Sequence, residues 1–243
     1  MKLLYAVDRG IGTITLSAPP RNELAHPAFA DHAELAAFLA APELRAVIVR
    51  GAGRHFCSGA AIGRLAELVK KPDEFRAALQ QGKALLDLLT FAPVPVLALI
   101  RGACLGAGLE IALACHFRMA SDHALLGLPE SSLGLLPGFG GTVLAADVAG
   151  RKVALDLMLS GRIIGAPEAL SLGLVDWVEP TAELEPRALG YVQSLVGDRP
   201  AAVVRAIMQA VHNARRLPRA QALEREADLF LELARARIAR GDT

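Results

Sequence analysis

Two segments of the chain share one plan, in which an apolar strand runs through a glycine turn into the start of a helix. They are VIVRGAGRHFCSGAAI, residues 47–62, and LALIRGACLGAGLEI, residues 97–111. Apolar strands without polar alternation are typical of a sheet that is covered on both faces. Strands that alternate with helices in this way predict an α/β arrangement.

The rest of the sequence continues this alternation. The pattern predicts a hairpin over 3–17, helices over 27–40, 73–91 and 151–160, and strands over 43–51, 94–102, 117–121, 124–128 and 174–179. Pro27 is expected in the first turn of its helix. From residue 181 onward the chain reads as charged helices with breaks near Pro200 and Pro218. We therefore predict a core over residues 1–180 and a C-terminal helical segment over residues 181–243.

The composition excludes several classes of function. The 243 residues are 53% hydrophobic with a net charge of +1, which predicts a globular protein without a nucleic-acid groove or a polybasic membrane patch. The longest apolar run, 91–100, contains two prolines and ends at Arg101, so no membrane span is expected. Asp8 comes too early for a signal peptide. Three cysteines in apolar segments indicate reduced, buried thiols and a cytoplasmic location.

The two glycine turns are candidates for binding a developing negative charge. A helix start has unpaired backbone N–H groups and a partial positive charge, and small residues let a ligand approach them closely. If both turns point to one place, the N–H groups of Ala60 and Ala107 would form an oxyanion hole. The spacing also fits a simpler interpretation, in which the glycines only allow strand and helix to pack tightly.

Two carboxylates lie close to these turns in the sequence. Glu110 is set among Gly, Ala and Leu in RGACLGAGLEIALAC, and Glu130 follows a short strand in LPESSLG. Two carboxylates in different environments can divide acid and base roles between them. The alternatives are that Glu110 only complements a helix dipole and that Glu130 is a surface residue after a proline. His26 and His32 have no Cys or acidic cluster beside them, so no metal site is predicted.

Four regions of the sequence resemble one family. HFCSGAAI (55–62), IRGACLGAGLEIALAC (100–115), LPESSLGLLPGFGGT (128–142) and GAPEALSLGLVDWV (165–178) are similar to the signature regions of the enoyl-CoA hydratase/isomerase, or crotonase, family. The resemblance runs from about residue 3 to 180. It implies a spiral of ββα units followed by a C-terminal helical segment that mediates trimer formation, with homotrimers or dimers of trimers as the expected assembly.

The resemblance also implies an activity and a site. It implies hydration of a 2-enoyl-CoA thioester without a metal or redox cofactor, with Ala60 and Ala107 as oxyanion-hole donors, Glu110 acting on water and Glu130 exchanging a proton with the α-carbon. Further positions expected to bind the acyl-CoA substrate are Arg21, Leu24, Ser58, Gly59, Ile62, Gly106, Pro129, Gly138 and Phe139. Isomerases of the family commonly keep only the second glutamate, so both glutamates favour hydration. The alternatives are an isomerase, a cyclic dienoyl-CoA hydratase, a carrier-linked dehydratase and a non-catalytic acyl-CoA-binding protein.

Overall fold

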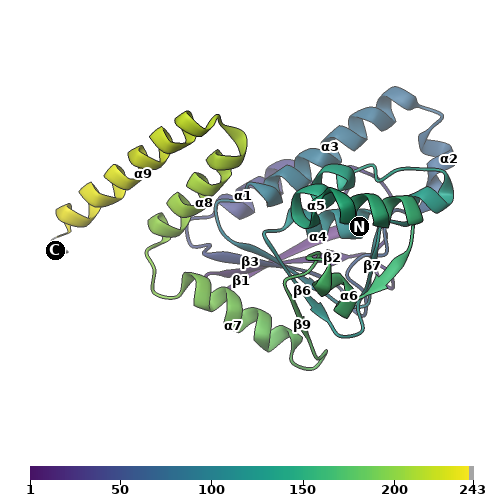
Figure 1. Cartoon of the computed structure of the whole chain (residues 1–243), viewed down its shortest axis with the longest axis horizontal. Helices are drawn as coiled ribbons and strands as arrows, with labels where there is room; N and C mark the ends of the chain where they lie inside the picture. Colours follow the sequence, from purple (N-terminus) through teal and green to yellow (C-terminus); the bar gives the residue numbers. More distant parts are fainter. Residues whose placement is uncertain (241–243) are drawn as a thin grey trace.

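The computed structural model describes residues 1–240 and is built around two sheets (Figure 1). The larger sheet has the strand order β1-β2-β3-β4-β6-β9, in which only the β1–β2 pair is antiparallel. Its strands are β1 Lys2–Asp8, β2 Ile11–Ser17, β3 Ala46–Gly51, β4 Val96–Ile100, β6 Phe117–Ser121 and β9 Trp177–Glu179. The smaller sheet has the order β5-β7-β8, with β5 Ala103–Leu105, β7 Leu125–Gly127 and β8 Ile163–Gly165.

Helices connect these strands and extend beyond the last of them. The helices are α1 His32–Ala40, η1 Ile62–Arg64, α2 Leu65–Leu68, α3 Pro72–Thr90, α4 Ala107–Ala114, η2 Pro129–Leu133, α5 Gly141–Ser160, α6 Ala166–Ser171, α7 Leu184–Val196, α8 Ala201–Arg216 and α9 Arg219–Ala239. The α/β class and the alternation expected from the sequence are therefore confirmed.

The larger sheet is covered on both faces, which explains why its inner strands are apolar throughout. Val47 and Val49 of β3 point into the main core, which contains buried residues of α1, α3 and α4. Ile48 points the other way, into a second cluster with Leu97 and the buried side of α7. Side chains on a strand alternate between faces, so a strand buried on both sides shows no polar alternation.

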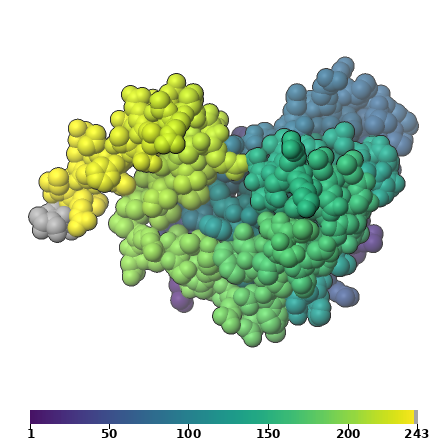
Figure 2. Space-filling model, viewed as in Figure 1, coloured from purple at the N-terminus to yellow at the C-terminus, as the bar shows by residue number. Residues whose placement is uncertain are grey.

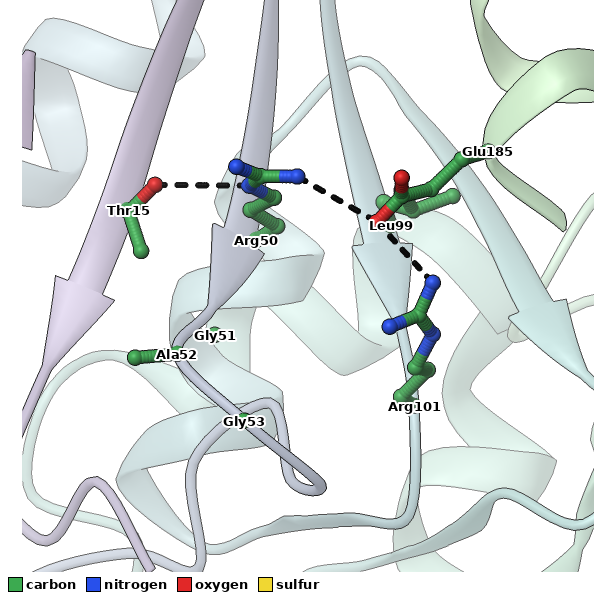
Figure 3. Close-up of a pocket in the computed structure, with 8 residues that line it drawn as sticks. All are labelled: Thr15, Arg50, Gly51, Ala52, Gly53, Leu99, Arg101 and Glu185. Atoms are coloured by element: carbon green, nitrogen blue, oxygen red, sulfur yellow. Dashed lines mark hydrogen bonds and ion pairs between the residues drawn. The ribbon is translucent and has the colours of Figure 1, made fainter. Parts of the chain in front are cut away.

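The start of α7 is fixed to the larger sheet by charge. Glu185, in the first turn of the helix, accepts from Arg50 at 3.2 Å and from Arg101 at 2.9 Å. Figure 3 shows the two guanidinium groups on either side of this carboxylate, at a cavity of about 340 Å³ that Thr15 also lines. The first helix of the C-terminal segment thus belongs to the packing of the sheet.

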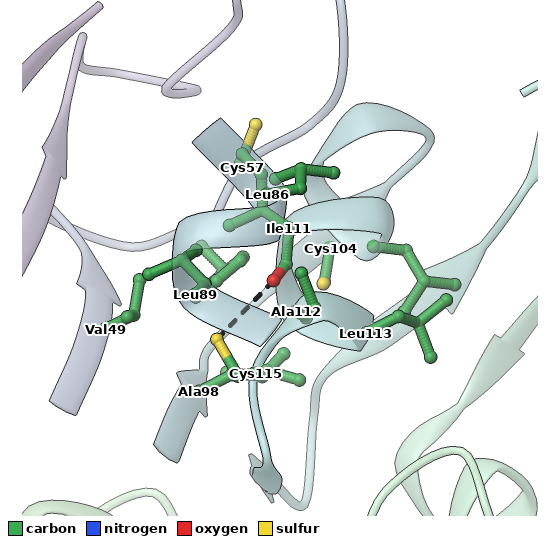
Figure 4. Packing of buried hydrophobic residues seen from close by; sticks show 14 of the residues in the cluster. Val49, Cys57, Leu86, Leu89, Ala98, Cys104, Ile111, Ala112, Leu113 and Cys115 are labelled. Atoms are coloured by element: carbon green, nitrogen blue, oxygen red, sulfur yellow. Dashed lines mark hydrogen bonds between the residues drawn. The ribbon is translucent and has the colours of Figure 1, made fainter. Parts of the chain in front are cut away.

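The smaller sheet is joined to the loop that leaves β3. Cys57 and Cys104 form a parallel bridge, and both side chains are buried (Figure 4). With Cys115 they are free thiols packed among apolar residues, as the sequence predicts. Burial raises the pKa of Cys57 and Cys115 to about 12, so these thiols remain protonated at neutral pH.

Some predicted boundaries are wrong for local reasons. The helix predicted over 27–40 begins only at His32, because the Asp31 side chain accepts the Glu34 N–H at 2.8 Å as its N-cap. Pro27 therefore lies before the helix. The strand predicted over 94–102 ends at Ile100, and a separate strand, β5, follows in the smaller sheet. The break falls at Gly102, whose φ of +52° turns the chain from one sheet into the other.

The last two helices form a hairpin that projects from the body (Figures 1 and 2). Helix α8 is held to the body by Arg205, which donates to the Ala41 carbonyl at 2.7 Å, and by His212, whose ring stacks on His116. Helix α9 packs mainly against α8. Among the helices of residues 1–240, none has the length and apolarity needed to span a bilayer.

Candidate active site

In the first glycine turn, the backbone N–H of Ala60 makes no hydrogen bond within the described residues. Ala60 forms a parallel bridge with Leu24, in which the Leu24 N–H donates to the Gly59 carbonyl at 2.9 Å and the Ala61 N–H donates to the Leu24 carbonyl at 2.8 Å. In a parallel bridge these bonds come from the neighbours of the central residue. The N–H of Ala60 thus lies outside the pairing, and it has no protein acceptor within residues 1–240.

The second turn leaves the N–H of Ala107 unused in the same way. Gly106 has a φ of +52° and donates its N–H to the Gly127 carbonyl at 2.9 Å. Helix α4 then begins at Ala107, whose N–H belongs to the first turn and has no acceptor within the helix. The described part of the chain offers it no other protein acceptor.

The two turns lie against one another. A methyl group built on Gly59, at its φ of +103°, would lie 3.9 Å from the backbone nitrogen of Ala107. One built on Gly106 would lie 3.9 Å from Cα of Gly59. The structure therefore brings the two turns together, as the oxyanion-hole interpretation requires.

Gly108 has a different structural role from Gly106, because it is needed for packing and not for the shape of the turn. It lies inside α4, where a methyl group would come within 2.1 Å of the Cys57 carbonyl oxygen. This glycine lets the helix pack directly on the segment that leads to Ala60. The packing interpretation of the glycines thus holds for Gly108, while the positive φ angles of Gly59 and Gly106 shape the two turns.

Glu110 lies one turn into α4 and is buried, with 1% of its surface exposed. Its Oε1 accepts the Phe139 N–H at 2.8 Å and the Gly141 N–H at 2.7 Å. Burial, with a smaller contribution from the negative charge of Glu130, raises the pKa of Glu110 from 4.5 to about 7, although the two backbone N–H groups act in the opposite direction. The interpretation of Glu110 as only a dipole partner does not explain this burial.

Glu130 stands on η2 and faces the second turn. Its Oε1 lies 2.8 Å from the position of a methyl group built on Gly106. Its Oε2 is buried and has no hydrogen-bond partner within the described residues. Burial also raises the pKa of Glu130. A buried carboxylate oxygen without a partner is costly, so this atom is available to a ligand at the turn.

The remaining predicted positions surround these groups. The Arg21 carbonyl accepts hydrogen bonds from the Ser58 N–H at 3.0 Å and from the Ser58 hydroxyl at 3.1 Å. These bonds hold the segment before Leu24 against the first turn. Ile62 begins η1 just beyond that turn with its side chain exposed. Pro129 precedes Glu130 in η2.

The Gly138–Phe139 pair lies on the Glu110 side of the site. The N–H of Phe139 binds the Glu110 carboxylate, but its ring is buried against Phe29, with ring centroids 6.3 Å apart. A methyl group on Gly82 of α3 would come within 2.7 Å of that ring. Phe139 thus contributes its backbone to Glu110 and its side chain to the wall between α3 and the loop before α1.

Asn22 is important to the site but was not predicted from the sequence. It is fully buried, and its Nδ2 donates to the carbonyls of Ala52, His55 and Phe56 at 2.9, 2.8 and 3.2 Å. These carbonyls belong to the segment that runs into the first turn. The sequence shows only an asparagine in a proline-rich loop, which is typical of any turn. Its distant partners give no local signal.

The comparisons with known proteins agree with this geometry. The sequence profile of the enoyl-CoA hydratase/isomerase family matches residues 6–241, and the chain belongs to this family. A Bacillus subtilis (strain 168) protein named "Probable enoyl-CoA hydratase" is 40% identical over 174 residues, which are 70% of this chain and 66% of that protein. The peroxisomal fatty acid beta-oxidation multifunctional protein MFP2 of Arabidopsis thaliana is 37% identical over 192 residues, 78% of this chain and 26% of that protein. The match thus spans less than two thirds of either relative.

Solved structures are similar over nearly the whole chain. An enoyl-CoA hydratase from Bacillus anthracis matches with a TM-score of 0.83 and 30% identity, covering 94% of this chain and 89% of that one. A Thermobifida fusca YX protein solved in complex with CoA matches with a TM-score of 0.83 and 29% identity, covering 98% and 94%. The crotonase fold expected from the sequence is therefore confirmed.

Proposed function

We propose that the protein is an enoyl-CoA hydratase, which adds water across the 2,3 double bond of an acyl-CoA thioester and, in reverse, dehydrates a 3-hydroxyacyl-CoA. The observation that carries this proposal is the meeting of two unused backbone N–H groups, those of Ala60 and Ala107, with two carboxylates of raised pKa, Glu110 and Glu130. The names of the relatives and of the similar structures support it.

The two N–H groups bind the thioester carbonyl oxygen. When water adds at the β-carbon, negative charge develops on this oxygen, and donors already in place stabilise it without reorganisation. Helix α4 begins at Ala107, so the positive end of the helix dipole adds to the same field. Gly59 and Gly106 leave room for the thioester to reach the backbone.

The two carboxylates move the protons. Glu110, in its ionised form, orients a water and takes one proton from it as the oxygen bonds to the β-carbon. Glu130, in its protonated form, gives its proton to the α-carbon. Mutual repulsion favours a state in which the pair holds one proton, and the reaction proceeds from the form of that state in which the proton is on Glu130. Afterwards Glu110 holds the proton, and exchange with solvent restores the starting state.

The CoA thioester is held by the residues around the two turns. We assign this role to Arg21, Leu24, Ser58, Gly59, Ile62, Gly106, Pro129, Gly138 and Phe139, which surround the two turns or the Glu110 carboxylate. The Thermobifida fusca protein in complex with CoA supports a CoA thioester as the substrate class.

The test is an absorbance assay with crotonyl-CoA on the wild type, E110Q and E130Q. Each Gln variant keeps the size of the side chain but cannot exchange a proton in the same way. We expect both to lose at least about 100-fold in kcat, consistent with the loss of general acid–base catalysis, while CoA-thioester binding is retained. Wild-type rates in both variants would refute the roles given to the two carboxylates.

The reaction needs neither a metal ion nor a redox cofactor in this proposal. Hydration changes no net oxidation state, and the described groups supply both the proton transfers and the charge stabilisation. Extensive dialysis against a chelator should leave the crotonyl-CoA rate unchanged. A rate that falls on dialysis and returns with an added divalent cation would contradict this part of the proposal.

We further propose that the chain assembles as a homotrimer or a dimer of trimers. Four large apolar side chains are strongly exposed: Phe230 and Ile238 on α9, at 70% and 76%, and Leu136 and Leu159 on the body, at 69% and 77%. Exposed apolar side chains of this kind are candidate contacts between copies of the chain. Pairing of two different regions between copies is head to tail, and it closes into a ring of three when the copies are related by a threefold rotation.

Sedimentation equilibrium measures the assembly directly. The wild type is expected at three or six times the 25.6 kDa of one chain, and the double variant F230E/I238E at a lower mass. A wild-type monomer at micromolar concentration would contradict the assembly. A cytoplasmic location is also part of the proposal, because three free thiols fit a reducing compartment.

A further inference from the structure

His55 connects the two turns of the site through its side chain. It lies in the segment between β3 and Ala60, and its Nδ1 accepts the N–H of Ala103 at 3.0 Å. Ala103 is the first residue of β5, the three-residue strand that leads into Gly106 and Ala107. The acceptor of this hydrogen bond thus lies on the segment that leads to Ala60, and the donor lies on the segment that leads to Ala107.

The ring is held in this position from both sides. Its own carbonyl accepts from Nδ2 of the buried Asn22 at 2.8 Å. A methyl group built on Gly102 would lie 2.5 Å from Nδ1 of His55, so the ring packs directly on the Gly102 backbone. Because Nδ1 accepts a hydrogen bond, the neutral ring carries its proton on Nε2.

We propose that His55 is a positioning residue, which sets the relative placement of the Ala60 and Ala107 N–H groups through its bond to Ala103. This inference rests on the proposed oxyanion hole. Main-chain bonds also join the two segments: the Phe56 N–H donates to the Arg101 carbonyl at 2.8 Å, and the Cys57 N–H donates to the Ala103 carbonyl at 3.1 Å. Without the imidazole acceptor, the Ala103 N–H loses its partner, and the start of β5 is held to the first turn's segment by the main-chain bonds alone. Charge stabilisation by fixed donors is sensitive to small changes in their placement.

The chain offers a matched control in His116. Its Nδ1 accepts the N–H of Val96 at 3.0 Å, so the same kind of bond occurs at the other end of β4, away from the turns. His116 also meets the Thr90 carbonyl and His212. H116L is therefore expected to lower the free energy of unfolding at least as much as H55L, without reaching the site.

The experiment compares H55L, H55N and H116L in crotonyl-CoA hydration. We expect H55L to lower kcat about 10- to 100-fold with KM within about threefold, because the charge stabilisation it disturbs is made in the transition state. H55N places an amide oxygen near the position of Nδ1 and should recover most of the rate. H116L should keep the wild-type kcat. Equal losses in H55L and H116L, or none in H55L, would overturn the positioning role.

A second readout does not depend on turnover. Butyryl-CoA has no double bond to hydrate, and the stretching frequency of its bound thioester carbonyl reports how strongly the two N–H groups polarise it. We expect a lowered frequency in the wild type and H116L, and a partial return toward the free value in H55L. An unshifted wild-type carbonyl would refute the oxyanion hole itself, and the role of His55 with it. A wild type that shifts the carbonyl but leaves crotonyl-CoA unchanged would contradict only the proposed substrate.

Discussion

Replacing Glu110 by Gln should stabilise the protein at neutral and higher pH. A carboxyl group with a higher pKa in the folded than in the unfolded state binds its proton more tightly when folded. The free energy of unfolding therefore falls as pH rises from the unfolded to the folded pKa. For Glu110 these are 4.5 and about 7, which corresponds to a loss of roughly 3 kcal/mol above pH 7. A Gln side chain does not titrate, and its amide oxygen can still accept hydrogen bonds from the N–H groups of Phe139 and Gly141.

The assay is urea unfolding of the wild type and E110Q at one protein concentration and at several pH values. Between about pH 5 and about pH 8, the wild type should lose about 2 to 3 kcal/mol relative to E110Q. The comparison isolates Glu110, because every other titrating group is common to both proteins. Parallel stability curves for the two proteins would show that Glu110 is not buried as an acid, and the assignment of its environment would be wrong.

Three further predictions concern the reaction and the glycines. First, the crotonyl-CoA kcat should pass through a maximum and fall as pH rises through about 7, because the carboxylate pair then loses the single proton that the reaction needs; a flat profile across this range would contradict the one-proton state. Second, G108A should lower the free energy of unfolding by about 1 to 3 kcal/mol, because the added methyl group meets the Cys57 carbonyl. Third, G190A, in the exposed middle of α7 with open space around it, should raise that free energy by about 0.5 to 1 kcal/mol; equal effects of the two glycine variants in urea unfolding would refute the packing described for Gly108.

The parts of the site that lie within one continuous segment could be predicted from the sequence. In RGACLGAGLEIALAC the strand end, the glycine turn, the Ala107 donor and Glu110 follow one another within eleven positions. Local geometry then fixes their arrangement, because a residue three positions into a helix lies one turn from its first N–H. The apolar strands β3 and β4 were predictable for a similar reason, since burial on both faces leaves a clear pattern.

Features that depend on distant partners could not be predicted. The N–H groups that bind Glu110 lie 29 and 31 positions away, in a glycine-rich loop whose sequence does not indicate its direction. Asn22 reaches three carbonyls more than 29 positions away, and His55 meets Ala103 across 48 positions. Such bonds depend on how the turns are brought together in three dimensions. The start of α1 was also missed, because Asp31 competes with Pro27 as the start signal.

The crotonyl-CoA kcat of A107P gives the sharpest test of the oxyanion hole. Ala107 is the first residue of α4, a position where proline is well tolerated, and proline has no N–H to donate. The helix should remain intact while the oxyanion hole loses one of its two donors, and kcat is expected to fall about 100- to 1000-fold with little change in the free energy of unfolding. A folded A107P that hydrates crotonyl-CoA at the wild-type rate would show that the Ala107 N–H does not stabilise the thioester oxygen.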